Sequence, residues 1–227
     1  MINLRLILFV LLPFLPGNFS YAQDWANLKR YQKENAELLM TKTEEQRIVF
    51  MGNSITDSWS IIRPEFFAGK PYINRGISGQ TTPQMLARFR QDVIDLQPAV
   101  VVILAGINDI AGNTGPSTIE MIADNIFSMA EQARTNHIKV VLCSVLPAAD
   151  FSWSPEEQPA EKVIALNALV KSYAKNHKIA YVDYHSAMKN DINGLKEELG
   201  SDSVHPNAAG YAVMEPLLEQ RLAEVLK

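Results

Sequence analysis

The stretch AVVVILAG, residues 99–106, is a continuous apolar run that ends in glycine. Strands with one solvated face alternate apolar and polar residues, whereas parallel strands covered by helices on both faces are apolar throughout. The run therefore predicts a buried parallel strand. Four further runs predict strands of the same sheet: RIVFMG (47–52), PYINRG (71–76), KVVLCSV (139–145) and IAYVDY (179–184).

Amphipathic stretches with helical spacing separate these runs. They occupy residues 82–96, 117–134, 159–176 and 207–227, and an extra helix is expected at 25–42, ahead of the first strand. In the second of them, Ser117 and Glu120 form an expected capping box. In the last one, Pro216 is expected to end or kink the helix. Strands that alternate with helices predict a three-layer α/β/α sandwich around a five-stranded parallel sheet.

The first 22 residues have the pattern of a secretory signal peptide. Arg5 precedes a short apolar stretch at 6–17, and small residues in SYA stand before an expected cleavage at Gln23. A membrane anchor is the alternative, but Pro13 and Pro16 interrupt a stretch already shorter than the ~20 residues that span a bilayer. We therefore expect one domain at 23–227, secreted or periplasmic, with a bacterial type of signal and no stable membrane anchor.

Charge and cysteine content limit the possible partners and crosslinks of the protein. The formal net charge is −4 and there is no cluster of Lys and Arg, which argues against nucleic acid as a partner. Cys143, the single cysteine, cannot form an internal disulfide and lies in a predicted strand, where it is expected to act as a small apolar residue. The sequence does not indicate an oligomeric state.

The first strand ends in GNSIT, so Ser54 stands at the carboxyl end of a buried strand. Ser54 either caps the following helix or is presented for chemistry. Ligands of doubly wound sheets bind beyond the carboxyl ends of the strands. GISGQTT follows the second strand and GINDI the third, so three polar loops are expected to meet at one edge.

A serine becomes a useful nucleophile when a base removes its proton and a third group orients that base. His137 and His177 precede strands, at the opposite edge, where a cation near a helix C-terminus explains them. His185 is on the correct edge and is a minor candidate. His205, in SDSVHPN, has Asp202 three residues before it, so the carboxylate can reach the imidazole. Alternatively, these residues form a turn and a helix cap.

An ester carbonyl that is attacked needs hydrogen-bond donors for its developing negative charge. The backbone N–H groups of Ser54 and Gly79 and the side-chain amide of Asn108 are candidates for this oxyanion hole. Taken singly, such a glycine and such an asparagine are more often turn residues.

The ordered blocks GNSIT, GISGQTT, GIND and DSVHPN resemble the four signature blocks of the SGNH (GDSL-type) hydrolases, a family of serine esterases and lipases. The resemblance implies a flavodoxin-like fold, with Ser54 as nucleophile, His205 as base and Asp202 as its carboxylate. It also implies Ser54, Gly79 and Asn108 as the oxyanion hole, and no metal or other cofactor. One difference is Asn53, where the family's common name has aspartate.

The expected substrate is a short-acyl ester, an acetyl ester above all, on a small molecule or glycan. Phe151 and Trp153 follow the fourth strand and, with Trp59, are candidates to line the pocket and stack on a sugar ring. Alternatively, Phe151 and Trp153 anchor their loop to the domain, and Trp59 packs in the core. The resemblance also permits a lysophospholipase or thioesterase.

Two other classes of function compete with the esterase. A metal-dependent hydrolase would use Asp183, His185, Asp202 and His205, but their spacing matches no common metal site and leaves Ser54 without a role. A non-catalytic glycan-binding module would retain the fold and bind sugar without turnover.

Overall fold

The computed structural model describes residues 24–40, 46–152, 154 and 156–227. The predicted signal peptide lies outside these residues, as does Trp153. The five strands are β1 (Ile48–Gly52), β2 (Tyr72–Gly76), β3 (Val100–Leu104), β4 (Lys139–Cys143) and β5 (Ala180–Val182). They form one parallel sheet in the order β2-β1-β3-β4-β5. This flavodoxin-like order confirms the predicted class of fold.

The register of the sheet aligns the ends of its first three strands. Gly52, the last residue of β1, pairs with Gly76 of β2 on one side and with Leu104 of β3 on the other. The loops after these three strands therefore begin at the same level. They also lie where the chain reverses its direction across the sheet, which is the usual binding site in doubly wound folds.

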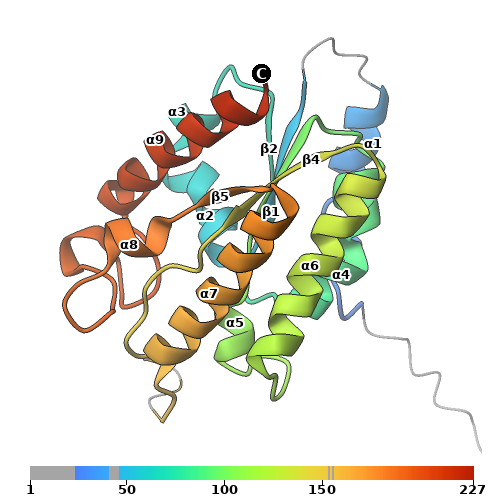
Figure 1. Ribbon diagram of the computed structural model, residues 1–227. Helices are drawn as coiled ribbons and strands as arrows, with labels where there is room; N and C mark the ends of the chain where they lie inside the picture. Colours follow the sequence, from blue (N-terminus) through green and yellow to red (C-terminus); the bar gives the residue numbers. More distant parts are fainter. Residues whose placement is uncertain (1–23, 41–45, 153, 155) are drawn as a thin grey trace, which may run out of the picture.

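Helices cover both faces of the sheet. The helices that cover the sheet are α2 (Ser54–Ile62), α4 (Thr82–Phe89), α6 (Ile119–Thr135), α7 (Pro159–His177) and α9 (Ala208–Val225). The other elements are α1 (Gln32–Met40), α3 (Pro64–Phe67), the π-helical turn η1 (Arg90–Ile94), α5 (Ile107–Ile110), α8 (Tyr184–Met188) and the 3-10 turn η2 (Glu197–Leu199). Helices α4, α6 and α7 pack side by side over one face, and α2 and α9 cover the other (Figure 1).

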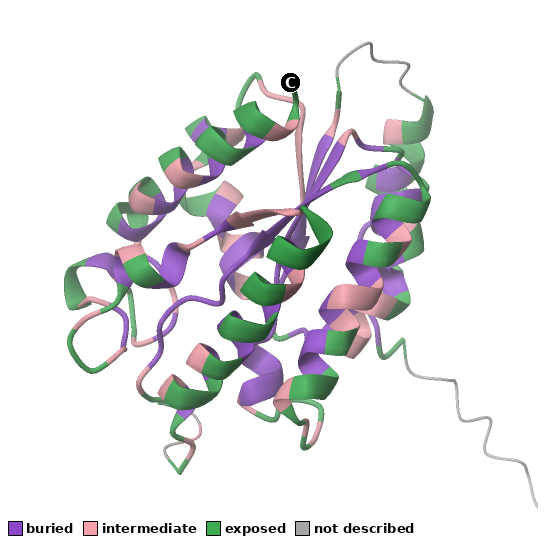
Figure 2. Cartoon of the chain, viewed as in Figure 1, coloured by how far each residue is buried: buried purple, intermediate pink, exposed green. Residues whose placement is uncertain are grey.

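Burial follows this layered arrangement. All five residues of β1 and of β3 are buried, and each covering helix turns its buried residues toward the sheet (Figure 2). On the face covered by α2 and α9, Trp59 stacks between Phe66 and Tyr211, with ring centroids 5.2 and 5.3 Å away. These apolar contacts hold α9 against α2 and so fix the two helices relative to each other.

The structure changes three local expectations in detail. The helix expected ahead of the first strand is present as α1 (Gln32–Met40), but it begins later than predicted, because the chain forms turns up to Tyr31. Thr118, not Ser117, caps α6, because its side chain accepts a hydrogen bond from the N–H of Met121. Pro216 does not end α9, which continues to Val225.

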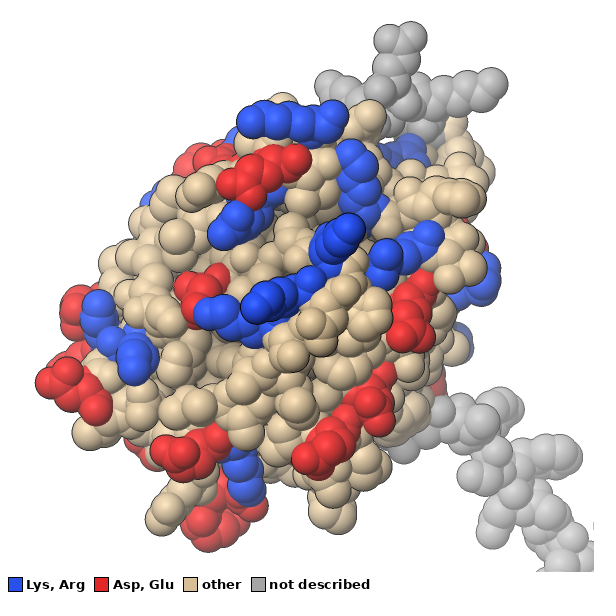
Figure 3. All heavy atoms as spheres, viewed as in Figure 1, with Lys and Arg blue, Asp and Glu red and all other residues tan. Residues whose placement is uncertain are grey.

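A hollow of about 610 Å³ lies at the amino ends of β4 and β5. Arg134, His137, Lys139 and Lys178 contribute to its lining, and helices α6, α7 and α9 end beside it. Lys and Arg gather toward this end of the face shown in Figure 3. Cations complement the partial negative charge of helix C-termini, which accounts for their position without a ligand.

Candidate active site

Ser54 is the first residue of α2, directly beyond β1. Asn53 is the N-cap, and its side chain accepts a hydrogen bond from the N–H of Ile55 at 3.2 Å. The capping role therefore belongs to Asn53, and the hydroxyl of Ser54 is available for another partner. The N–H of Ser54 begins the helix and has no intrahelical acceptor.

That partner is His205. The Oγ of Ser54 lies 2.9 Å from Nε2 of His205, and Nδ1 of His205 lies 2.8 Å from Oδ2 of Asp202. The other oxygen of Asp202 accepts the backbone N–H groups of Val204 and His205, at 2.8 and 2.7 Å. Asp202 thus holds both the ring and the loop that carries it.

The charge of Asp202 suits this role. Partial burial acts to raise the pKa of Asp202, but hydrogen bonds from the backbone of His205 and Val204 and from the His205 ring outweigh it. The pKa therefore lies below its ordinary value, and the carboxylate is an acceptor at neutral pH. An ionised acceptor requires Nδ1 to carry the proton, so the unprotonated Nε2 accepts the hydrogen bond of the Ser54 hydroxyl.

The loops after β2 and β3 meet opposite Ser54. Asn108, in α5, donates one N–H of its side-chain amide to the backbone carbonyl of Gln80 at 2.9 Å. Its second N–H remains for another acceptor. Gly79, directly before Gln80, has a φ of 79°, a left-handed conformation that favours glycine. A Cβ atom at Gly79 would meet no atom within 4 Å, so its surroundings are open.

Asp109 fixes the start of α4 against the loop of Asn108. Its carboxylate accepts the backbone N–H of Thr82 at 2.9 and 3.0 Å and the Thr82 hydroxyl at 2.6 Å. Burial raises the pKa of Asp109 to about 6, although the hydrogen bonds from Thr82 favour the ionised form. These contacts join the loop after β3 to the one after β2.

Ser54, His205, Gly79 and Asn108 share one cleft of about 510 Å³. Among the described residues, its other lining residues are Ser58, Ser78 and Asn113. The sequence analysis missed these last three, because a lone serine or asparagine carries no signal of its function. The site residues expected at one edge of the sheet are thus brought together, and Asp202 stands behind His205.

The aromatic residues that were expected to line the pocket are not found in the cleft among the described residues. Trp59 is 1% exposed and Phe151 is fully buried, so both are core residues and neither lines the cleft. The predictions that they contact substrate are wrong, because each ring is used to join segments of the core. Trp153, the third aromatic candidate, lies outside the described residues.

The proposed metal ligands are not gathered either. Among the described residues, no group of three or more His, Cys, Asp and Glu side chains is placed to hold a metal ion. Asp183 caps α8 and pairs with Lys171, and His185 lines a separate pocket beside α7.

Among the residues that the structure describes, none of the helices has the length and apolar character needed to cross a bilayer.

The fold, with the contacts among Ser54, His205 and Asp202, is that of a carboxylic-ester hydrolase. Residues 50–213 match the model of the GDSL-like Lipase/Acylhydrolase family, and the chain belongs to that family.

The chain is similar to several known members. A GDSL-like lipase of Bacteroides thetaiotaomicron, known from its crystal structure, is 49% identical and superposes with a TM-score of 0.85, covering 88% of this chain and 98% of that one. Esterase TesA of Pseudomonas aeruginosa is 25% identical over 84% of this chain and 92% of its own length. An acetylxylan esterase of Geobacillus stearothermophilus is 24% identical, over 74% and 90% respectively.

Proposed function

We propose that Ser54, His205 and Asp202 form a catalytic triad that hydrolyses short-acyl esters, acetyl esters above all, on carbohydrate. The continuous chain of contacts from Ser54 Oγ through His205 to Asp202, at 2.9 and 2.8 Å, supports the triad. His205 takes the proton of Ser54 as Ser54 attacks the ester carbonyl, and Asp202 stabilises the imidazolium that forms. His205 then protonates the leaving alcohol.

Water completes the reaction. His205 removes a proton from the water that attacks the acyl-enzyme, and Ser54 recovers its proton when the acid is released. In both steps the negative carbonyl oxygen is bound by the N–H groups of Ser54 and Gly79 and by the amide of Asn108. These groups are fixed before the reaction begins, which is why such donors are effective.

The polar lining of the cleft supports a short acyl group and a polar alcohol. None of the described lining residues has a hydrocarbon side chain, and three of them are serines. A long acyl chain would leave its apolar surface without partners in such a cleft, at about 25 cal/mol per Å² of surface left in water. Ser58, Ser78 and Asn113 instead offer hydrogen bonds to hydroxyl groups of a sugar.

A series of p-nitrophenyl esters from C2 to C16 tests the acyl preference. We expect kcat/KM to be highest at C2 and to fall steadily toward C8. Activity that rises toward C8–C16 would contradict the acetyl preference and favour a lysophospholipase. Acetylated xylan and acetylated sialic acid, assayed beside an acyl-thioester, test the alcohol. Turnover of the thioester alone would favour a thioesterase.

We also propose that the protein is exported to the periplasm or the medium after cleavage before Gln23. The apolar stretch and the SYA sequence support this proposal. N-terminal sequencing of protein recovered outside the cytoplasm should begin at Gln23. Recovery of the whole chain in the cytoplasm would contradict export.

A further inference from the structure

We infer that Gln80 is a positioning residue that ties the segment ahead of the first strand to the oxyanion hole. The inference rests on the proposed function, because it takes Gly79 and Asn108 as the oxyanion donors. The segment meant is residues 24–40, here called the leading segment, which comprises a turn region and helix α1.

Gln80 contacts the oxyanion hole through its backbone. It follows Gly79 directly, so the two residues share a peptide group and the orientation of Gly79 depends on that of Gln80. Its carbonyl oxygen accepts the side-chain amide of Asn108 at 2.9 Å. A displacement of the Gln80 backbone would therefore move two of the three proposed donors together.

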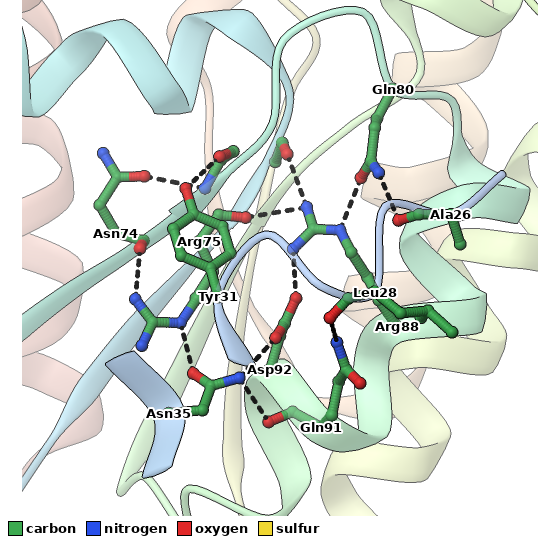
Figure 4. Close-up of polar contacts among 12 residues, drawn as sticks. Ala26, Leu28, Tyr31, Asn35, Asn74, Arg75, Gln80, Arg88, Gln91 and Asp92 are labelled. Carbon is green, nitrogen blue, oxygen red and sulfur yellow. Dashed lines mark hydrogen bonds and ion pairs between the residues drawn. The ribbon is translucent and has the colours of Figure 1, made fainter. Parts of the chain in front are cut away.

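The side chain of Gln80 is held at both ends. Its Nε2 donates to the carbonyl of Ala26 in the leading segment at 2.8 Å, and its Oε1 accepts Nε of Arg88 at 2.5 Å (Figure 4). Gln80 is 3% exposed. With a donor on one side and an acceptor on the other, only one orientation of the amide satisfies both neighbours.

Arg88 extends this network to the nucleophile. Its guanidinium is fully buried and donates to the carbonyls of Gly52 and Arg75, at 3.1 and 2.8 Å. Gly52 ends β1, two residues before Ser54. The charge of Arg88 is compensated by Asp92, 2.9 Å away, and Asp92 in turn accepts the amide of Asn35 in α1 at 2.7 Å (Figure 4).

The leading segment is bound by the side chains of three glutamines in the described part of the chain. Gln80 donates to the carbonyl of Ala26. Gln84 donates to the carbonyl of Trp25 at 2.7 Å, and Gln91 donates to the carbonyl of Leu28 at 2.6 Å. Of the three, only Gln80 also contacts a proposed oxyanion donor. Gln91 therefore provides a matched control, because it makes the same kind of bond without reaching the site.

The expected effect of losing these bonds is on the chemical step. Donors must be placed to within about 0.5 Å to stabilise a transition state, and an error of about 1 Å costs on the order of 100-fold in rate. Substrate binding in the ground state depends less on this placement, because the oxygen becomes negative only in the transition state. Loss of the Gln80 side-chain bonds should thus lower kcat and leave KM nearly unchanged.

The test compares Gln80→Met, Gln80→Glu and Gln91→Met in the full chain, with Ser54→Ala in parallel. The substrate is the p-nitrophenyl ester that the wild type turns over fastest, so the result does not depend on the acyl preference. Assays are run well below the Tm of each variant, at pH 8. Gln80→Glu retains the acceptor for Arg88 and loses the donor for Ala26, and it serves if the methionine variant fails to fold.

We expect kcat to fall at least tenfold in Gln80→Met and by a smaller factor in Gln80→Glu, with KM within about twofold of the wild type. Gln91→Met should retain kcat within about twofold. A folded Gln80 variant with the kcat of the wild type, an equal loss in Gln91→Met, or a change confined to KM would overturn the inference. A kcat of Ser54→Ala close to that of the wild type would instead show that the proposed triad itself is wrong.

Discussion

Ser54 and His205 are 151 positions apart in the chain, yet Ser54 Oγ lies 2.9 Å from Nε2 of His205. The packing of α9 on α2 sets this distance. The hydroxyl of Tyr211, in α9, donates to the carbonyl of Ile55 at 2.7 Å, one residue beyond Ser54. The loop that carries His205 enters α9 directly, so the buried contact fixes the base against the nucleophile.

Ser54→Ala should lower kcat by a factor on the scale of about 10⁶, as in other triad hydrolases, because it removes the hydroxyl that contacts His205. Hydrolysis of p-nitrophenyl acetate and labelling by a fluorophosphonate both measure the loss. Ser60→Ala, on the same helix, removes a hydroxyl that donates to the Asp57 carbonyl and accepts the Asn74 amide. This hydroxyl does not line the cleft, so kcat should be unchanged. Undiminished labelling of Ser54→Ala would place the nucleophile elsewhere.

Asp202→Asn should lower kcat by about 10⁴ while the protein remains folded. The asparagine oxygen can still accept the backbone N–H groups of Val204 and His205, so the loop should keep its shape. Its amide, however, faces Nδ1 of His205 as a donor and selects the wrong tautomer. Steady-state kinetics and circular dichroism together check the prediction, and a loss below tenfold would argue against the orienting role of Asp202.

Asn108→Ala should lower kcat by about 10²–10³, which is the usual cost of losing one oxyanion donor. KM should change little, because the amide acts on charge that develops in the transition state. Asn136→Ala, which removes an amide at the far end of α6, is the control. Equal kinetics of the two variants would remove Asn108 from the oxyanion hole.

Asp109 should make stability depend on pH. Its pKa is raised from an ordinary 3.8 to about 6 in the folded protein, so the folded state binds the proton more tightly than the unfolded state. Stability from this group is therefore fully present below pH 3.8 and is lost as pH rises toward 6. A shift of about two units corresponds to about 3 kcal/mol.

Asp109→Asn should remove this dependence. The difference in unfolding free energy, wild type minus variant, should decrease by up to about 3 kcal/mol between pH 4 and pH 7. Urea titrations at fixed ionic strength measure it. A difference that stays constant or increases over this range would mean that the carboxyl is not held in the protonated form by burial.

Much of the fold could be predicted from short-range pattern. Continuous apolar runs such as residues 99–106 mark strands covered on both faces, and the residues that follow them were expected at one edge of the sheet. Local sequence was less informative about helix ends. Ser117 and Thr118 have similar capping chemistry, and Thr118 takes the cap because α6 begins at Ile119.

The sequence contains a signal for the network around Arg88. In residues 82–96, Met85 and Phe89 mark the apolar face of the helix, and Arg88 and Asp92 follow at spacings that place them on the same face. A charged pair four residues apart on a buried face indicates an internal ion pair. Which carbonyls Arg88 would bind could not be predicted, because they come from the ends of β1 and β2.

By itself the sequence determined the sheet, the order of its loops and the residue types at its edge, because strand burial and loop position follow from nearby residues. Tertiary structure decided which side chains face the cleft. It placed Trp59 and Phe151 in the core and brought Gln80 between the leading segment and Asn108. Such contacts depend on how distant segments pack, and this packing cannot be predicted from the residues next to each position.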